Sequence, residues 1–414
     1  MVNIVKIAFR NLRRYQRRTL LTSMLITLGV VAVLLFLAVS GSFKNMMIGQ
    51  ITDSMLGHLQ IHQRGYMAAI DTLPLDRNLD AQQVALVENL LSEHEAVEAF
   101  STRIKLGALF SNYTETTNIR LNGVEPDREL RTVPLLLDRV VQGDKQGLLE
   151  RGEIVVPELL ARGMNVGVGD GVVLVATNRD GSVNGQSFVV RGIVEGVTGP
   201  GGRDGFIHIE DARSLLRLED REVSEIAVRL KDRQQLEQVM AAIGPALEAI
   251  RVHPDRPVFE VHAWERLTPF ANIARMIDLM TVFIKVMLVA IVLVSIMNVM
   301  VMAVYERINE IGTIAAIGTG PGKIHSLFLV EGLLLGVFGT VLGVLLSLVS
   351  VLGIGAARIS FDFGQQKGLI LDPILYPGDI ITTALIVVAI AVLGSLHPAW
   401  KAAKMDPITA LRHV

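Results

Sequence analysis

Four long runs of apolar residues, separated by polar segments of very different length, shape the pattern of this 414-residue chain. They occupy residues 19–40, 279–304, 326–352 and 380–396. About 20 apolar residues in a helix cross the hydrocarbon core of a bilayer, and the first run contains no charged residue. The pattern therefore predicts four transmembrane helices with these bounds.

The segment between the first two runs, residues 41–278, has the mixed composition of a folded soluble domain. Alternation in Ser224–Leu230 predicts a strand, and the apolar spacing in Ala81–Glu93 and Gln234–Ile250 predicts helices. Strand-helix units at both flanks indicate one subdomain built from the two ends, and repeated glycine-rich turns predict a strand-rich insert at about residues 110–215. The expected fold class is an α-helical membrane protein with four transmembrane helices and a large mixed α/β extracytoplasmic domain inserted between helices 1 and 2.

Basic residues set the expected orientation, because Lys and Arg near span ends stay on the cytoplasmic side. Residues 1–18 carry six Lys and Arg and no acid, and their apolar positions recur at helical spacing, which predicts an amphipathic helix in the cytoplasmic interface. The tail at 397–414 is also basic, whereas residues 41–278 hold 25 Lys and Arg against 34 Asp and Glu, a difference of −9. We expect both termini in the cytoplasm and the domain outside.

Two compositional features limit the alternatives. Ala38-Val39-Ser40 resembles a signal-peptide cleavage site, but the apolar run before it exceeds the roughly 7–15 residues of a signal sequence, so an uncleaved anchor is favoured. The chain has no cysteine, which excludes disulfides and thiolate metal ligands. Its net charge of −2 averages a basic inside and an acidic outside and gives no indication of nucleic-acid binding.

Patterns typical of catalysis are weak. The sequence GTGPGK at Gly318–Lys323 differs from a phosphate-binding loop, which has four residues between its glycines and Ser or Thr after its lysine. His58 and His62 would share one face of a strand or a helix as a candidate metal pair, with ordinary surface histidines as the alternative, because no third ligand lies nearby. We expect no catalytic residue, metal or cofactor in this chain.

The predicted third span carries glycines on one helical face, which permits close approach of another helix. They are Gly332, Gly336, Gly339 and Gly343. Glu331 begins this face, and an ionisable residue within a span is a functional candidate, with a carboxylate satisfied by a neighbouring helix as the alternative. Lys285, in the second span, can reach the outer interface with its long stem.

A polar, turn-ended stretch, YERINEIGTIAAIGTGPG, joins the second and third spans. A charged helix held between two membrane helices is a rigid element that a permease can offer to a partner that hydrolyses ATP. We predict a cytoplasmic coupling helix at residues 305–323. Its expected ATPase-coupling residues are Tyr305, Glu306, Arg307, Glu310, Ile311 and Gly318.

The order of spans and several segments resemble the FtsX-like/MacB-type ABC transporter permease superfamily. These segments are AFRNLRRYQRRTLLTSMLITLGV, ERINEIGTIAAIGTGPGKI, FLVEGLLLG and HPAWKAAKMDPITALR. Within the domain, GEIVVPELLARGMNVGVGDGVVLVA and FVVRGIVEGVTGPGGRDGFIHIEDARSLLRLED are similar to the LolC/LolE lipoprotein-releasing permeases, which also have the closest layout.

The resemblance implies a non-catalytic, multi-pass permease subunit of the bacterial inner membrane, with its large domain in the periplasm. Two such permeases, identical or paralogous, would work with a separate ATPase dimer that binds ATP and Mg, since the chain shows no ATPase motif. Motion of the ATPase would pass through the coupling helix and the second span to the domain.

Two function classes remain open. The first is release of lipoproteins from the inner membrane toward the outer membrane through a periplasmic carrier, and the second is MacB-like export of peptides or drugs, or FtsX-like regulation of cell-wall hydrolases. For the first class, apolar residues at the outer ends of spans 1 and 2 are substrate- or lipid-facing candidates, although they could equally face membrane lipid or the partner permease. They are Phe43, Met46, Met47, Phe270, Met276, Met280 and Phe283.

Overall fold

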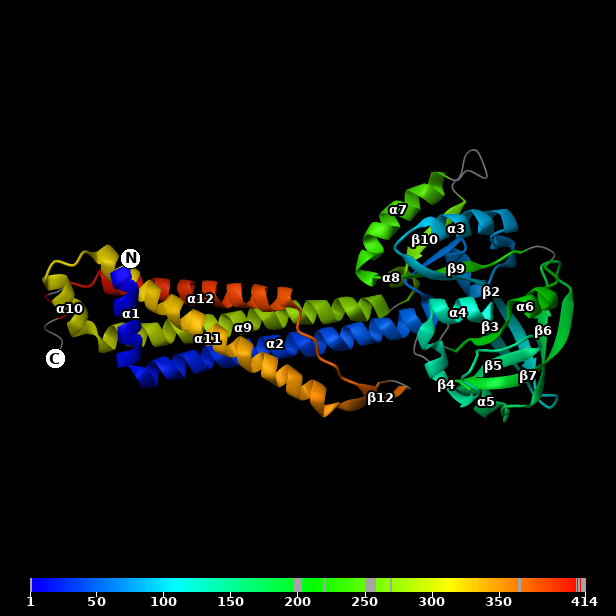
Figure 1. The fold of residues 1–414 in the computed structure, drawn as a ribbon, viewed down its shortest axis with the longest axis horizontal. Helices are drawn as coiled ribbons and strands as arrows, with labels where there is room; N and C mark the ends of the chain where they lie inside the picture. The colour runs from blue at the N-terminus through cyan, green and yellow to red at the C-terminus, as the bar shows by residue number, and fades with distance from the viewer. Residues whose placement is uncertain are drawn as a thin grey trace. The chain divides into compact units, whose positions relative to one another are not determined.

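The structure, a computed structural model, contains two compact units (Figure 1). It describes residues 2–196, 203–218, 221–249, 258–268, 270–363, 366–406, 408 and 410. The helical unit comprises Met1–Asn45, Arg275–Phe361 and Ile370–Val414, and the α/β unit comprises Met46–Ala274 and Asp362–Leu369.

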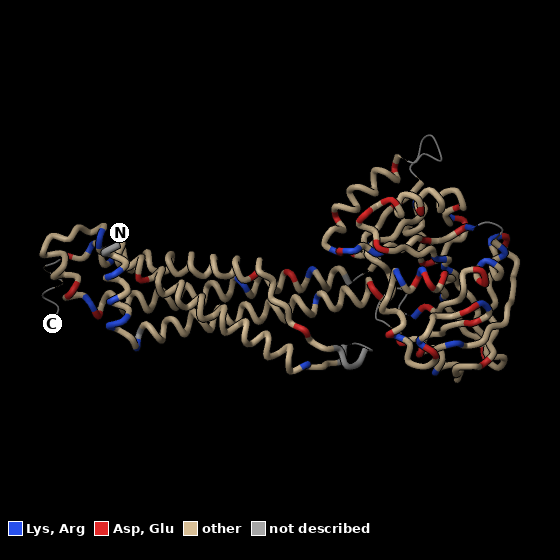
Figure 2. Tube along the Cα trace, viewed as in Figure 1, with Lys and Arg blue, Asp and Glu red and all other residues tan. Residues whose placement is uncertain are grey.

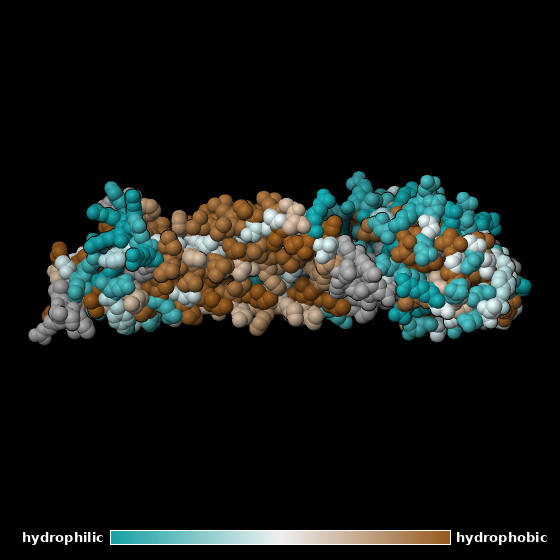
Figure 3. Space-filling model, turned by 90° about the horizontal axis from the view of Figure 1, so that it is seen from below, coloured by the Kyte–Doolittle hydropathy of each residue, from teal (hydrophilic) through white to brown (hydrophobic). Residues whose placement is uncertain are grey.

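The helical unit is built around four helices that are long and apolar enough to span a membrane, which confirms the predicted number of spans. Its helices are α1 (Val2–Arg14), α2 (Gln16–Ile51), α9 (Phe270–Glu306), α10 (Ile308–Ala316), α11 (Pro321–Ala357) and α12 (Pro377–Ala403). Two short strands, β11 (Ser360–Phe363) and β12 (Gln366–Ile370), pair with each other and lie between α11 and α12 in the sequence, and the segment Asp362–Leu369, which includes parts of both, belongs to the α/β unit. Lys and Arg gather around α1 (Figure 2), and the surface of the spans beyond it is hydrophobic (Figure 3).

All four spanning helices are longer than the apolar runs that predicted them, and the extension is greatest at one end of α2 and of α9. Helix α2 continues to Ile51 instead of ending at Ser40, and α9 begins at Phe270 instead of Leu279. Hydropathy marks where a chain enters water, but a helix ends only where its backbone is interrupted, and no proline lies between Ser40 and Ile51.

The glycine face of α11 is in close contact with two other helices of the same chain. A Cβ atom added at Gly336 would lie 2.5 Å from the Cβ of Ala391 on α12, and one added at Gly343 would lie 2.6 Å from the Cβ of Val30 on α2. Gly332 likewise faces α12, and Gly339 faces α2. Absent side chains at these four positions therefore let α11 pack tightly against both helices.

A mixed sheet in the order β10-β1-β9-β2-β3-β8-β5-β7-β4 forms the α/β unit, and β6 pairs with β2 and β7. The strands are β1 (Leu59–Gln63), β2 (Val97–Ser111), β3 (Thr116–Val124), β4 (Val140–Gly143), β5 (Glu153–Pro157), β6 (Gly171–Thr177), β7 (Val183–Val194), β8 (Gly205–His208), β9 (Glu225–Leu230) and β10 (Phe259–Ala263). The helices are α3 (Ala81–Glu93), α4 (Pro126–Thr132), α5 (Glu158–Gly163), α6 (Ile209–Leu216), α7 (Leu236–Ala249) and α8 (Trp264–Leu267).

Strand β2 belongs to two lobes of this unit. Its first half pairs with β9 in a lobe made from both flanks of the domain, and its second half pairs with β3 and β6 in the inserted lobe. The insert also contains α4, α5 and α6 among its strands. Helix α3 begins at Ala81 because Asp80 and Gln83 form a capping box, each accepting a hydrogen bond from the backbone N–H of the other.

Candidate functional site: the coupling helix and its buried ion pair

Helix α10 is a short segment between two spanning helices. Arg307 separates it from α9, and a turn follows in which Gly318 adopts a φ of +93°, a conformation that strongly favours glycine. Pro321 then occupies the first turn of α11, where its missing N–H costs nothing. The coupling helix is therefore shorter than the predicted segment 305–323. Tyr305 and Glu306 belong to α9, and the turn ends the helix before Gly318.

The side chain of Arg307 is buried at this junction and holds three helices together. Its Nη1 donates to Oε1 of Glu331 on α11 at 2.9 Å, and its Nε donates to Oε2 of Glu310 on α10 at 3.2 Å. Asn11 on α1 donates to the same Oε1 of Glu331 at 2.8 Å. Arg307 and Glu331 are 4% and 0% exposed, so this is a buried, charge-assisted network.

Aromatic rings and further hydrogen bonds complete the surroundings of the Arg307 guanidinium. Its central carbon lies 5.7 Å from the ring centroid of Tyr15 and 5.7 Å from that of Phe328, within cation–π range of both. The hydroxyl of Tyr15 donates to Glu310 Oε1 at 3.3 Å, and Arg14 lies 3.4 Å from the same oxygen. Helix α1 is thus tied to the coupling helix as well as to α11.

Electrostatics keep Arg307 charged in this place. Burial alone would lower its pKa, but the carboxylate of Glu331, and then that of Glu310, raise the pKa above its ordinary value. The arginine and Glu331 therefore compensate each other. Removing Arg307 would leave the buried Glu331 without a counter-charge, and removing Glu331 would leave Arg307 with Glu310 alone.

The predicted coupling residues differ in what they present to a partner. Tyr305 and Glu306 are exposed, and the Tyr305 hydroxyl accepts a hydrogen bond from Lys401 Nζ at 2.6 Å. Glu310 is partly exposed, whereas Arg307 and Ile311 are buried inside the unit and can only position the helix.

Sequence reasoning missed the apolar part of the exposed face of α10. Ile314 and Ile317, which is 80% exposed, follow Glu310 by four and seven residues and so lie on the same side of the helical turns. The signal available in the sequence was this spacing from Glu310. A partner that docks here meets a carboxylate followed by two isoleucines.

The candidate residues for substrate or lipid contact also separate by exposure. Met276, Met280 and Phe283 recur at helical spacing on α9 and are all more than half exposed. By contrast, Met47 is buried in the hydrophobic core of the α/β unit, and Phe43 lies 6.2 Å from Phe361, centroid to centroid. Met46 is half-buried, and the side chain of Phe270 lies outside the described residues. The exposed apolar surface therefore belongs to α9.

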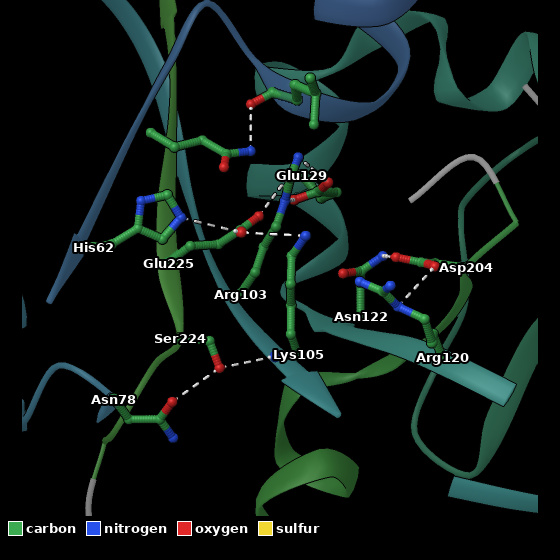
Figure 4. Close-up of polar contacts among 12 residues, drawn as sticks. His62, Asn78, Arg103, Lys105, Arg120, Asn122, Glu129, Asp204, Ser224 and Glu225 are labelled. Carbon is green, nitrogen blue, oxygen red and sulfur yellow. Dashed lines mark hydrogen bonds and ion pairs between the residues drawn. The ribbon is translucent and has the colours of Figure 1, made fainter. Parts of the chain in front are cut away.

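A second buried polar cluster lies where the two lobes of the α/β unit share β2 (Figure 4). Arg103 on β2 contacts Glu129 of α4 at 2.7 Å and Glu225 of β9 at 3.0 Å. Lys105 lies 3.2 Å from Glu225, and His62 Nε2 lies 3.5 Å from it. Because Glu129 belongs to the insert and Glu225 to the flanking lobe, Arg103 links the lobes. Burial alone would raise the pKa of Glu225, but Lys105, His62 and Arg103 hold it well below its usual range.

His58 and His62 are buried and face different partners. His58 Nδ1 accepts from the backbone N–H of Leu230 at 3.0 Å, and its Nε2 lies 3.4 Å from Asp53, whereas His62 faces Glu225 and stacks on Tyr66. The prediction of surface histidines was wrong, since the four-residue spacing of two histidines does not show whether they are buried. Among the described residues, no group of three or more His, Asp and Glu side chains could hold a metal ion.

Two family models match the chain, one from the first span through most of the α/β unit and the other over the last three spans. Residues 19–246 match the MacB-like periplasmic core domain, and residues 282–407 match the FtsX-like permease C-terminal region. The chain belongs to the family of FtsX-like permeases with a MacB-like periplasmic core domain. The resemblance predicted from the sequence is thereby confirmed.

Two relatives of this FtsX-like permease align over most of its length. The lipoprotein-releasing system transmembrane protein LolC of Neisseria meningitidis is 26% identical over 413 residues, covering 94% of this chain and 92% of that protein. The macrolide export ATP-binding/permease protein MacB of Wolinella succinogenes is 25% identical over 427 residues, covering 98% of this chain and 60% of that protein. The crystal structure of the periplasmic region of MacB from Actinobacillus actinomycetemcomitans matches 53% of this chain and 92% of that one, with 12% identity and a TM-score of 0.33.

Membership of the family fixes the general role. The FtsX-like permease is a multi-pass inner-membrane subunit of an ABC transporter, and such a subunit works with a partnering ATPase. The four spanning helices and the periplasmic-type domain suit that role.

Proposed function

We propose that this permease releases lipid-anchored proteins from the inner membrane toward the outer membrane. The observation that carries the proposal is the alignment with LolC of N. meningitidis, which runs through 94% of this chain and 92% of that protein. It therefore includes both the periplasmic domain and the spans.

In this proposal the chain itself performs no catalysis. Two permeases, identical or paralogous, bind an ATPase dimer that holds ATP and Mg, and a periplasmic carrier receives the lipoprotein. The exposed face of α10, with Glu310, Ile314 and Ile317, is the contact for the ATPase. Arg307 and Ile311 position that face from inside the unit. Both termini and α10 lie in the cytoplasm, and the α/β unit lies in the periplasm.

The exposed apolar stripe on α9, formed by Met276, Met280 and Phe283, is evidence for an acylated substrate. Each methylene taken from an apolar environment is worth about 0.8 kcal/mol, so a lipid anchor leaves the bilayer only if another apolar surface receives it and external work is supplied. Met276, Met280 and Phe283 offer such a surface, and the thioethers of methionine adapt to chains of varied shape.

The test is ATP-dependent release of a fluorescent lipoprotein from proteoliposomes that contain the permease with its ATPase. Met280→Asp should abolish transfer to the soluble carrier, because a carboxylate on the stripe repels acyl chains, whereas Met280→Leu should retain it. Assembly with the ATPase should be the same in both variants. Release by Met280→Asp at the wild-type rate would contradict the proposed surface.

Export is the second candidate, because the MacB relative of W. succinogenes aligns with 98% of this chain. It predicts a different consequence of depletion. Depleted cells would keep their lipoproteins correctly sorted and become sensitive to peptides or drugs, and a hydrolase regulator would instead give a division or cell-wall defect. Retention of lipoproteins in the inner membrane after depletion would favour the first proposal over both.

A further inference from the structure

A cleft of about 460 Å³ opens between α2, α9 and α12 in the helical unit. Most of its wall is apolar and includes Val33, Val289, Val292 and Val387. This volume lies within the range of pockets that bind small molecules, about 300–1,000 Å³. The cleft is not part of the coupling network, and its residues differ from those of the exposed α9 stripe.

Two opposite charges lie in the wall of this otherwise apolar cleft. Nζ of Lys285 on α9 is 3.8 Å from Oδ1 of Asp379 on α12, and the side chains are 34% and 35% exposed. That separation is too long for a hydrogen bond. Within the described part of the chain, no hydrogen bond engages either charged group. The ammonium and the carboxylate therefore both retain hydrogen-bonding capacity toward the cleft.

Polar contacts between α9 and α12 locate this charged pair along the spans. At the coupling-helix end, Lys401 of α12 donates to Tyr305 of α9 at 2.6 Å. Lys285 lies 20 residues from Tyr305, and Asp379 lies 22 residues from Lys401. At about 1.5 Å per residue these intervals are roughly 30 Å, which equals the thickness of the hydrocarbon core. The pair therefore lies at the headgroup boundary of the leaflet opposite the coupling helix.

The apolar part of the cleft extends from that boundary toward the middle of the bilayer. From Asp379 the lining continues along α12 to Val387, eight residues and about 12 Å of helix. One leaflet contributes roughly half of the 30 Å core, so the cleft follows most of its depth. The cleft thus has a pair of charges at the headgroup level and an apolar lining as deep as one leaflet. These features match a phospholipid that inserts one acyl chain.

We propose that this cleft binds a phospholipid with an amine headgroup, such as phosphatidylethanolamine. The phosphate lies against Lys285, the headgroup ammonium lies against Asp379, and one acyl chain enters between α2, α9 and α12. The fully acylated cysteine of a protein anchor carries neither a phosphate nor an ammonium, whereas the headgroup of the phospholipid supplies both charges next to the acyl chain. This site goes beyond the proposed release of lipoproteins and does not depend on it.

The experiment uses phosphatidylethanolamine that carries a photoactivatable diazirine in one acyl chain. The full chain, in its assembly with the ATPase, is irradiated in vesicles containing this lipid, and labelled peptides are identified by mass spectrometry. We expect labelling of the α9 and α12 peptides that line the cleft. Val289→Trp, or Ile386→Trp from the other helix, should fill the cleft and reduce this labelling at least fivefold. Val286→Trp, on the exposed face of α9, is the matched control and should leave it unchanged.

The headgroup is tested by competition and by charge. Excess unlabelled phosphatidylethanolamine should displace the probe better than phosphatidylglycerol, which has the phosphate but no amine, and Asp379→Asn should remove this difference. Lys285→Met should weaken labelling by either lipid.

Undiminished labelling in both tryptophan variants would overturn the site, and equal competition by the two lipids would overturn the amine contact. Cross-linking of Val289→Cys to a second permease copy would show that a protein fills the cleft instead.

Discussion

Arg307 is shared by two carboxylates and two aromatic rings, although it lies in a break between two helices. The planar fork of a guanidinium can donate to Glu331 and Glu310 at once while its carbon lies within cation–π range of Tyr15 and Phe328. A lysine at this position would present one compact ammonium and would not reproduce this fork geometry.

Removing the arginine alone should destabilise the helical unit. We expect Arg307→Met to cost about 3–5 kcal/mol, because Glu331 then remains buried without a counter-charge. The double variant Arg307→Met with Glu331→Leu should recover most of that loss, since two apolar residues replace the pair. Thermal unfolding of the purified chain measures both effects. Simple addition of the two single-variant losses would contradict the coupling.

Glu225 gives the α/β unit a pH dependence. Its folded-state pKa lies below the unfolded value of about 4.3, so its charge stabilises the fold above pH 4.3, and this stabilisation is lost as pH falls through and below that value. We expect the unfolding temperature of the α/β unit to fall between about pH 5 and pH 3 more steeply in the wild type than in Glu225→Gln. Calorimetry of the full chain measures this unfolding temperature. The control is Glu222→Gln, because the carboxylate of Glu222 belongs to an ion pair at the surface. Parallel curves for Glu225→Gln and the wild type would refute the assignment.

At the scale of elements, the contact between α11 and α12 depends on the absence of side chains at Gly332 and Gly336. Gly336→Ala should destabilise the helical unit by about 1–3 kcal/mol, because the new Cβ meets that of Ala391 at 2.5 Å. Adding Ala391→Gly should restore stability, since it removes the opposing atom. Gly353→Ala, at a position with open space around it, is the control and should be neutral. Failure of the second substitution to rescue the first would show that the helices meet elsewhere.

Helix α10 should transmit work from the ATPase through its exposed face. Glu310→Arg should uncouple ATP hydrolysis from transport, because it reverses the charge beside Arg14 and Arg307 and at the proposed contact. Ile317→Asp, which leaves the ion pairs intact, should weaken binding of the ATPase. Hydrolysis and substrate release are measured on the same proteoliposomes, with Thr313→Ser as the conservative control. Cross-linking that places α10 remote from the ATPase would contradict the coupling role.

The sequence was sufficient to predict the four spans and the domain between the first two, because a long charge-free run has few stable alternatives to a membrane helix. It was insufficient for the ends of α2 and α9, which depend on the backbone outside the bilayer. It also could not pair Asn11 with Glu331, the partner of Arg307, since 320 residues separate Asn11 from Glu331 and only the packing of α1 on α11 brings them together. The parallel pairing of β3 with β8 is equally non-local and lacks a local signal.

At the scale of the whole molecule, the absence of native cysteine allows orientation to be tested with single added thiols. We expect a membrane-impermeant maleimide to label Lys145→Cys in the α/β unit from the periplasmic side. Gly320→Cys, in the turn after α10, should react only after the inner membrane is permeabilised. Both positions are exposed, so burial does not explain a difference. Labelling of Gly320→Cys in intact spheroplasts would contradict the proposed topology.

The glycine face of α11 has a consequence for the assembly of the transporter in the cell. Because α2 and α12 already occupy it within the same chain, the packing of α11 in a newly inserted permease is complete before the chain meets another subunit. Of the four spans, α9 is the least covered by its own chain and is the surface left for a later encounter. Biogenesis can then proceed in two stages, in which each permease folds alone and pairs with a second copy afterwards. An unpaired copy is a stable intermediate in the bilayer.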